Sequence, residues 1–143
     1  VNDDIIISDY NKGFLEKSDI EIIAKSFESP IFLDTKKELG SWCSDINYIK
    51  INSQEFNNSK SQIDASTSLH SKIIVTRGKH GCDYQGQNFP TTEVPVKDVS
   101  GAGDTFLAGL VVKFIETNSI KKAIDFAQEC TTKVVQKTGV SVV

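Results

Sequence analysis

Short apolar runs alternate with helical stripes along this chain, and this alternation constrains its fold more than any other feature. Four runs occur in the first 76 residues, at 4–8, 31–34, 46–51 and 72–76. The first is rich in β-branched residues and lacks polar–apolar alternation, as expected for a parallel strand covered on both faces. Such runs, separated by helical segments, predict an α/β fold with a mostly parallel sheet.

Two segments between these runs have helical character. Capping-box spacing at Ser18 and Glu21, followed by apolar residues at helical intervals, predicts a helix over residues 18–28, and Pro30 ends it. Residues 53–71 are rich in Ser, Asn and Gln and predict one or two short helices with loops.

The last third of the chain has the strongest helical pattern. Apolar stripes predict two helices within residues 103–137, the second capped by Ser119 and ended by Gly139. Upstream, we expect a turn at residues 77–81 and a hairpin over 82–89. Because no repeat or long linker divides the sequence, all 143 residues are expected to form one α/β domain.

Composition excludes several classes of protein. The chain has 16 Lys and Arg against 19 Asp and Glu, giving a net charge of −3, and Arg77 is its single arginine. Without a basic stripe, we do not expect nucleic-acid binding. No apolar run approaches the roughly 18 residues of a membrane span, and the first four residues lack the basic region of a signal peptide. We therefore expect a cytoplasmic protein with no membrane contact.

The cysteines and histidines do not form a known pattern. Cys43, Cys82 and Cys130 are odd in number and widely spaced, which favours plain buried thiols over a disulfide framework or a zinc site. His70 and His80 lie in no metal-binding motif, so a histidine-dependent hydrolase has no support from the sequence.

One loop carries a chemical signal. Residues 98–105, read as DVSGAGDT, precede a strongly amphipathic helix. The small residues Gly101, Ala102 and Gly103 would let backbone N–H groups at the helix start approach an anion such as phosphate. A dinucleotide-binding fingerprint needs a small residue where Phe106 stands, and no Walker motif is present.

Asp104 distinguishes this loop from other phosphate-binding loops. Its carboxylate follows the anion hole directly, close enough to take a proton from a hydroxyl that attacks the bound phosphorus. This combination favours phosphoryl transfer. The residues also allow a structural alternative, in which the glycines permit tight helix–strand packing and Asp104 is a carboxylate favoured by the helix dipole.

The sequence from Asp98 to Val111, DVSGAGDTFLAGLV, resembles the second signature of the ribokinase-like (PfkB) carbohydrate kinases. Lys50 to Glu55 resembles the NxxE element of this family, and Thr76 to Gly81 resembles its TxGxxG turn. The resemblance implies a three-layer α/β/α architecture with a mostly parallel sheet. It covers the C-terminal half of such a kinase, without the sugar-binding N-terminal half and the β lid.

Within the family, residues 8–13, 34–36 and 134–139 look most like D-glycero-D-manno-heptose 7-phosphate kinases, which make a precursor of lipopolysaccharide. The chain departs from that pattern at three positions, where it has Asn11, Thr35 and Val99. The resemblance therefore implies a sugar or sugar phosphate as substrate, with a heptose 7-phosphate as the specific expectation.

The resemblance also implies roles in catalysis and metal binding. Asp104 would be the base that activates the sugar hydroxyl, and Gly101, Ala102 and Gly103 would form the anion hole for the transferring phosphoryl group. Asn52 and Glu55 would organise a hydrated Mg²⁺ through waters, since Mg²⁺ keeps much of its hydration shell.

Nucleotide and monovalent-cation sites are implied in the same way. ATP would lie against Lys50, Thr76, Gly78 and Gly81. A possible K⁺ site would be formed by Asp98 and the loop containing Gly139 and Ser141. Lys12, Lys36 and Lys37 could reach phosphates but receive no role.

Structural alternatives accompany the predicted roles. Asn52 could cap the following helix with Glu55 as its partner at the third position, and this role is compatible with metal binding. Thr76 and Gly78 could belong to a simple turn at the end of a strand.

Three functional hypotheses follow, in order of preference. The first is the ATP-binding and catalytic part of a sugar-phosphate kinase. The second is a nucleotide-binding or assembly module without catalysis. The third is a fragment whose exposed sheet edge must be covered by its N-terminal half or by another copy of the chain. A dehydrogenase is disfavoured because of Phe106.

Overall fold

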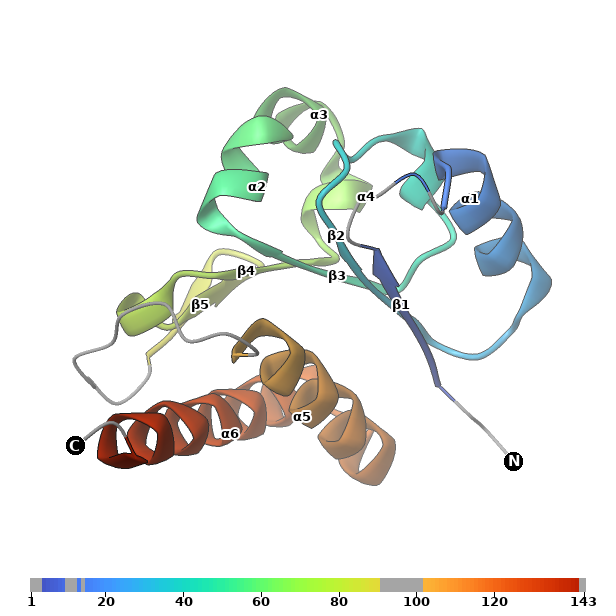
Figure 1. Cartoon of the computed structure of the whole chain (residues 1–143). Helices are drawn as coiled ribbons and strands as arrows, with labels where there is room; N and C mark the ends of the chain where they lie inside the picture. Colours follow the sequence, from blue (N-terminus) through green and yellow to red (C-terminus); the bar gives the residue numbers. More distant parts are fainter. Residues whose placement is uncertain (1–3, 10–12, 14, 91–101, 142–143) are drawn as a thin grey trace. The chain divides into compact units, whose positions relative to one another are not determined.

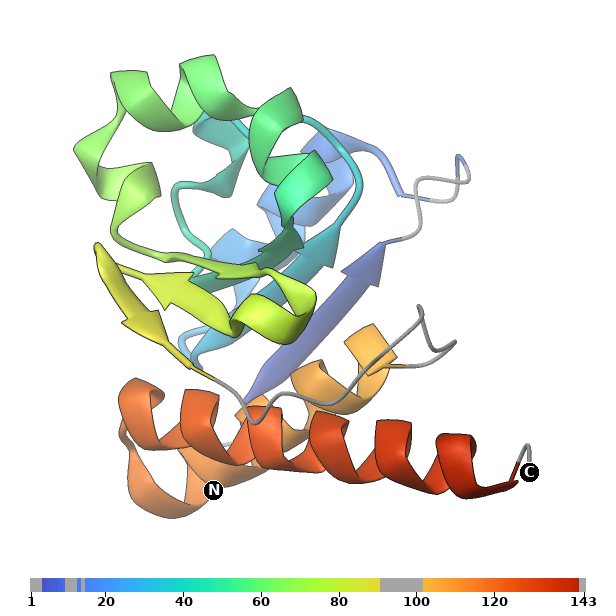
Figure 2. The same cartoon turned by 90° about the vertical axis from the view of Figure 1, so that its left-hand side faces the viewer.

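The computed structural model describes residues 4–9, 13, 15–90 and 102–141, and for residues 79, 102–104 and 133–141 it describes the backbone only. Its elements alternate as the sequence predicts (Figures 1 and 2). Two compact units are present: residues 1–76 with 83–87, and residues 77–82 with 88–143.

The strands form a six-stranded sheet in the order β1-β2-β3-β4-β5-β6. They are β1 (Ile5–Asp9), β2 (Ile31–Thr35), β3 (Tyr48–Asn52), β4 (Ile73–Thr76), β5 (Cys82–Tyr84) and β6 (Gln87–Phe89). β1 to β4 pair in parallel, in a register that aligns Ile7, Leu33, Ile49 and Ile73 across the sheet. The prediction of a mostly parallel sheet is therefore confirmed.

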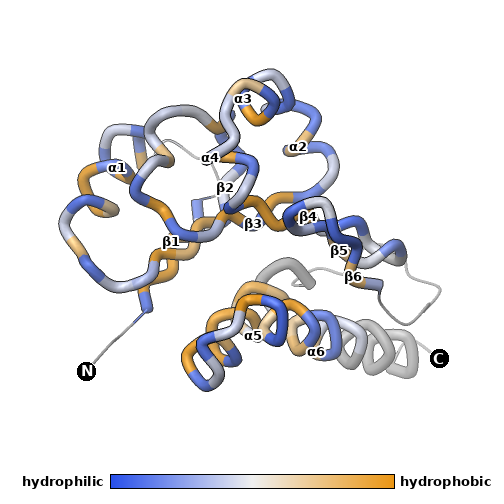
Figure 3. Tube along the Cα trace, turned by 180° about the vertical axis from the view of Figure 1, so that it is seen from behind, coloured by the Kyte–Doolittle hydropathy of each residue, from blue (hydrophilic) through white to orange (hydrophobic). Residues whose placement is uncertain are grey.

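Helices cover one face of the first four strands. They are α1 (Lys17–Ser26), the 3₁₀ helix η1 (Ser41–Cys43), α2 (Ser53–Asn58), α3 (Lys60–Ala65) and α4 (Thr67–His70). Ile20 of α1, Ile63 of α3 and Leu69 of α4 are buried against the isoleucines and valines of the strands. Figure 3 shows the hydrophobic residues along β1 to β3 in orange. Each such buried side chain contributes about 1.5–3 kcal/mol to the free energy of folding.

The opposite face of these strands carries an aromatic row. The rings of Phe32 and Tyr48 stack with centroids 5.2 Å apart, and Tyr84 lies 6.4 Å from Tyr48. Burial raises the pKa of Tyr48 and of Tyr84, because water no longer solvates the phenolate. β1 is an edge strand of this sheet, and its Ile6 is 47% exposed. The prediction that a further chain segment covers this edge stays a prediction.

The second unit contains two long helices, α5 (Ala102–Thr117) and α6 (Ile120–Ser141), which pack along each other. Gly109 makes their close approach possible, because a Cβ there would lie 3.3 Å from Ala127 Cα and from Cys130 Sγ. Asn118 joins the helices in a left-handed conformation, with φ of 54°. Within the described residues, no helix is long and apolar enough to cross a membrane.

Three details differ from the sequence prediction. α1 begins earlier than expected: its cap is Glu16, whose N–H donates to Asp19 at 2.9 Å, so the predicted Ser18–Glu21 capping box is wrong. Residues 53–70 form three short helices where one or two were expected. α6 continues through Gly139 to Ser141, so this glycine does not end the helix. A single helical glycine costs only about 1 kcal/mol, which the rest of a long helix tolerates.

Candidate functional site

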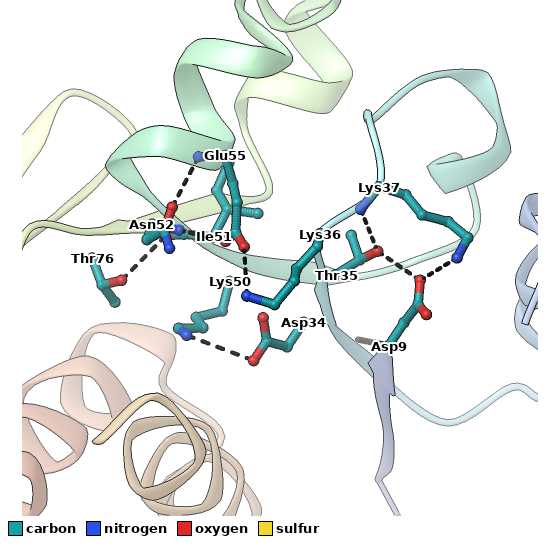
Figure 4. Close-up of polar contacts among 10 residues, drawn as sticks. All are labelled: Asp9, Asp34, Thr35, Lys36, Lys37, Lys50, Ile51, Asn52, Glu55 and Thr76. Atoms are coloured by element: carbon teal, nitrogen blue, oxygen red, sulfur yellow. Dashed lines mark hydrogen bonds and ion pairs between the residues drawn. The ribbon is translucent and has the colours of Figure 1, made fainter. Parts of the chain in front are cut away.

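The polar ends of four parallel strands gather at one edge of the sheet. Asp9, Thr35, Asn52 and Thr76 are the last residues of β1, β2, β3 and β4. Because the strands are parallel, their carboxyl ends meet at the same edge, where open α/β sheets bind ligands. Figure 4 shows these side chains together with the lysines and carboxylates beside them.

Asn52 and Glu55 form a reciprocal cap at the start of α2. Asn52 Oδ1 accepts a hydrogen bond from the Glu55 N–H at 2.8 Å, and Glu55 Oε1 accepts one from the Asn52 N–H at 2.9 Å. The structural alternative for this pair is thus confirmed. The cap fixes one Glu55 oxygen and leaves Oε2 at the carboxyl edge, so the capping role does not compete with a ligand at that oxygen.

Lys50 lies directly beside Asp34 on the neighbouring strand. The two residues are register partners of β3 and β2, and Lys50 Nζ lies 3.6 Å from Asp34 Oδ2. Their side chains are 9% and 17% exposed. The ammonium group is therefore held close to the edge in a largely desolvated position, where attraction to an anion is stronger than in water.

A second charged cluster joins the ends of β1 and β2. Lys37 Nζ lies 2.8 Å from Asp9 Oδ2, and the Thr35 hydroxyl donates to the same oxygen at 2.9 Å. The Lys37 N–H in turn donates to Thr35 Oγ1 at 3.0 Å. All three side chains are buried. Sequence reasoning gave Asp9 and Asp34 no role, although a carboxylate directly after an apolar run was the available signal.

Lys36 makes a different contact from its neighbour Lys37. Its ammonium lies 3.8 Å from Glu55 Oε2, and its side chain is 56% exposed whereas that of Glu55 is 12% exposed. The contact is longer than a hydrogen bond. Lys36 therefore balances the charge of Glu55 without being held by it.

The turn after β4 contains the glycines predicted to approach a nucleotide. Gly78 has φ of 58° and open space around its Cα, whereas Gly81 has φ of 80° and packs against Phe89. The Arg77 N–H donates to the Gly81 carbonyl at 2.8 Å. Thr76, which ends β4, donates its hydroxyl to the Ile51 carbonyl at 3.3 Å. The contact with Phe89 therefore explains the glycine at position 81, whereas Gly78 leaves room for a ligand, and the predicted contact of both glycines with ATP stays a prediction.

Part of the predicted site lies at the edge of the described residues or outside them. Asp98 and Gly101 lie outside, while Ala102, Gly103 and Asp104 form the first turn of α5, as the amphipathic pattern predicts. Gly139 and Ser141 lie within α6, so the prediction that they belong to a loop is wrong. Their role in binding K⁺ stays a prediction. The backbone explains this difference, because α6 continues its regular hydrogen bonding where a loop would expose carbonyls.

The cysteines form no disulfide among the described residues. Burial raises the pKa of the Cys43 thiol to about 11. This thiol stays protonated near neutral pH and is a poor nucleophile. Among the described residues, no group of three or more His, Cys, Asp or Glu side chains could hold a metal ion.

The edge nevertheless fits a hydrated Mg²⁺ that arrives with a phosphate ligand. Glu55 presents one carboxylate oxygen toward the edge while its other oxygen is fixed by the cap. Mg²⁺ in nucleotide sites keeps several waters and uses one or two carboxylates together with substrate phosphates. The donor set therefore suits a metal brought by the nucleotide and not a dedicated metal cage.

The sequence matches a family of known proteins and several curated relatives. The model of the pfkB family carbohydrate kinases matches residues 15–142. The bifunctional protein HldE of Helicobacter pylori strain G27 is 32% identical, over 96% of this chain and 34% of that protein. The HldE protein of Hydrogenovibrio crunogenus is 31% identical, over 99% of this chain and 33% of that protein. The chain thus spans about a third of the length of these curated relatives.

Solved structures share the fold. A ribokinase from Thermotoga maritima matches with a TM-score of 0.70 and 18% identity, over 92% of this chain and 50% of that one. The adenosine kinase of Schistosoma mansoni in complex with 2-fluoroadenosine matches with a TM-score of 0.69 and 17% identity, over the same shares. The ribokinase-like fold predicted from the sequence is therefore confirmed.

Proposed function

Since the chain belongs to the pfkB family of carbohydrate kinases, we propose that it forms the nucleotide-binding and catalytic part of a kinase that transfers the γ-phosphoryl group of ATP to a sugar hydroxyl. The observation that carries the proposal is the gathering of Lys50, Asn52, Glu55 and Thr76 at the carboxyl edge of four parallel strands. Ligands of open α/β sheets bind at this edge.

Different residues of the described part would bind the phosphates, the metal and the nucleotide. Lys50 would attract the phosphates, and Glu55 Oε2 would face the metal through water. Bound Mg²⁺ would neutralise phosphate charge and orient the phosphates. Asn52 fixes the carboxylate of Glu55 through the cap and thereby positions it for this role. Gly78 would leave room for the nucleotide.

Asp104 would supply the acid–base chemistry from the first turn of α5. Its carboxylate would accept the proton of the attacking hydroxyl while a bond forms between that oxygen and the γ-phosphorus. The bond from phosphorus to the β–γ bridging oxygen breaks, and ADP leaves with the electron pair. Backbone N–H groups of Gly101, Ala102 and Gly103 would stabilise the charge on the transferring group.

The acceptor is proposed to be a sugar phosphate, with a heptose 7-phosphate as the specific candidate. The proposal draws on the resemblance of residues 8–13, 34–36 and 134–139 to heptose 7-phosphate kinases and on similarity to HldE proteins. Because those relatives are about three times as long, we propose that sugar binding requires a further half contributed by additional chain. Potassium dependence is a finer proposal that rests on the family resemblance of Asp98, Gly139 and Ser141 and not on a loop, since Gly139 and Ser141 lie in α6.

Replacing the proposed base tests this function. In a kinase completed with a sugar-binding half, Asp104→Asn is expected to lower kcat by about 10²–10⁴-fold, because general base catalysis is lost. ADP affinity should stay within about twofold, since the nucleotide phosphates do not need the proton acceptor. ADP release in a coupled assay and fluorescence titration with ADP measure the two quantities.

Asp125→Asn is the matched control, because Asp125 is an exposed aspartate on α6. This variant should keep wild-type turnover. Turnover retained in Asp104→Asn would remove the base from the proposal. Nucleotide binding without sugar consumption in the wild type would instead favour the non-catalytic module.

A further inference from the structure

Two consecutive lysines after β2 have opposite environments. Lys37 is buried, and its ammonium lies 2.8 Å from an Asp9 oxygen that also accepts the Thr35 hydroxyl. Lys36 is 56% exposed, and its ammonium lies 3.8 Å from Glu55 Oε2. Exposed ion pairs of this kind contribute little to stability, whereas buried pairs are costly to break. Lys37 is therefore fixed, and the contact of Lys36 can be exchanged.

Glu55 is held so that its free side faces Lys36. Oε1 accepts the Asn52 N–H, and the Glu55 N–H donates to Asn52, so the carboxylate cannot turn away without losing the cap. Lys50 does not take the place of Lys36, because its ammonium is paired with Asp34 at 3.6 Å. Figure 4 shows the Lys36 side chain extending from the end of β2 toward Glu55.

We propose that Lys36 is the resident counter-ion of Glu55 and that its ammonium competes with a divalent cation for Oε2. The inference rests on the proposed function, because it takes Glu55 as the carboxylate that faces the metal. When the metal arrives, the ammonium moves into solvent, which the exposed side chain permits. Lys36 thus weakens binding of the metal alone and keeps the Glu55 carboxylate, whose side chain is 12% exposed, charge-balanced between turnovers.

This competition predicts a gain of affinity on removing the lysine charge. Lys36→Gln is expected to tighten binding of Mn²⁺, used alone as the probe, by about two- to fivefold, the range that corresponds to losing one exposed ion pair. Lys36→Arg keeps the charge beside Glu55 and should bind Mn²⁺ as the wild type does. Paramagnetic broadening of the backbone amide signals of residues 54–56 in an NMR titration gives the affinity.

Lys25→Gln is the matched control. Lys25 is 60% exposed and lies 3.7 Å from Glu21, so this variant removes a comparable surface ion pair on α1. It should leave Mn²⁺ affinity at residues 54–56 unchanged. The same titration is repeated with Glu55→Gln, which is expected to abolish the broadening because it removes the carboxylate charge.

The outcomes separate this inference from the proposed function. Equal Mn²⁺ affinity in Lys36→Gln and wild type, with broadening that still depends on Glu55, overturns the role of Lys36 and leaves the metal role of Glu55 intact. Equal tightening in Lys25→Gln also overturns it, because the effect would then be one of net charge. Broadening that persists in Glu55→Gln contradicts the proposed metal position itself and the inference with it. Absence of broadening from every variant overturns the inference alone, because the proposed function has the metal arrive with the nucleotide.

Discussion

Gly81 shows how strongly a single backbone position is determined in this chain. It adopts φ of 80°, and a Cβ there would lie 2.1 Å from the Phe89 carbonyl oxygen. No side chain fits at that distance without movement of the backbone. Gly86 has a similar φ of 77° in the β5–β6 turn, but a Cβ at this position would meet nothing within 4 Å. A substitution at Gly86 would therefore introduce backbone strain alone, whereas one at Gly81 would introduce backbone strain and a steric clash.

Alanine substitutions at these glycines should have unequal effects. Gly86→Ala is expected to cost about 1 kcal/mol in the free energy of unfolding, because a left-handed residue acquires a Cβ. Gly81→Ala carries the same strain and must also displace Phe89, so its cost should be at least twice as large. Urea denaturation followed by circular dichroism measures both. Equal losses of unfolding free energy in the two variants would show that Phe89 moves aside at no energetic cost.

Sequence reasoning found the residues of the site more readily than their partners. The spacing of Asn52 and Glu55 predicts the cap, because a cap depends on local sequence, whereas the metal role of Glu55 comes from the family resemblance and stays a prediction. The pairing of Lys50 with Asp34 depends on the register between β3 and β2, which no local pattern encodes. For the same reason, the sequence could not tell that Lys36 reaches Glu55 while Lys37 turns to Asp9.

Among the elements, β1 is tied at its end to the segment that follows β2 by the Asp9–Lys37 pair. The pair is buried, and Thr35 reinforces it through a hydrogen bond to the same Asp9 oxygen. Removing one partner of a buried pair leaves the other charge poorly compensated, which costs more than the pair itself contributes. The position of β1 in the sheet should therefore depend on this lysine.

The adjacent lysines allow a direct comparison. Lys37→Met is expected to lower the free energy of unfolding by about 3 kcal/mol, because the Asp9 carboxylate stays buried without this counter-charge. Lys36→Met should change it by less than about 0.5 kcal/mol, as is usual for an exposed pair. Thermal and urea unfolding of both variants check the difference. Similar losses in the two variants would mean that burial does not distinguish these lysines.

Element boundaries were less predictable than element types. Each predicted strand is present, because short β-branched runs are strong local signals. The predicted start of α1 was wrong, because Glu16 and Asp19 have the same three-residue spacing as Ser18 and Glu21 and form the observed cap, so the helix already begins at Lys17. A glycine such as Gly139 is typical of a helix end, yet the long α6 tolerates it.

The molecule as a whole matches one part of each longer protein to which it is similar. The match to a ribokinase covers 92% of this chain but 50% of that structure, and the chain spans about a third of its curated relatives. Lys50, Asn52 and Glu55 at the carboxyl edge and the first turn of α5 contain the groups proposed to contact ATP. We therefore expect nucleotide binding to belong to this chain.

Calorimetric titration of the folded chain with ATP, in the presence and absence of Mg²⁺, tests this expectation. We expect saturable binding that Mg²⁺ strengthens and that Gly103→Val weakens at least tenfold, because a branched side chain at the first turn of α5 would block the approach of the phosphate. Ala108→Val, an exposed position on the same helix, should bind as the wild type does. Failure of the folded chain to bind ATP, or unchanged binding by Gly103→Val, would contradict the assignment of the nucleotide site to this chain.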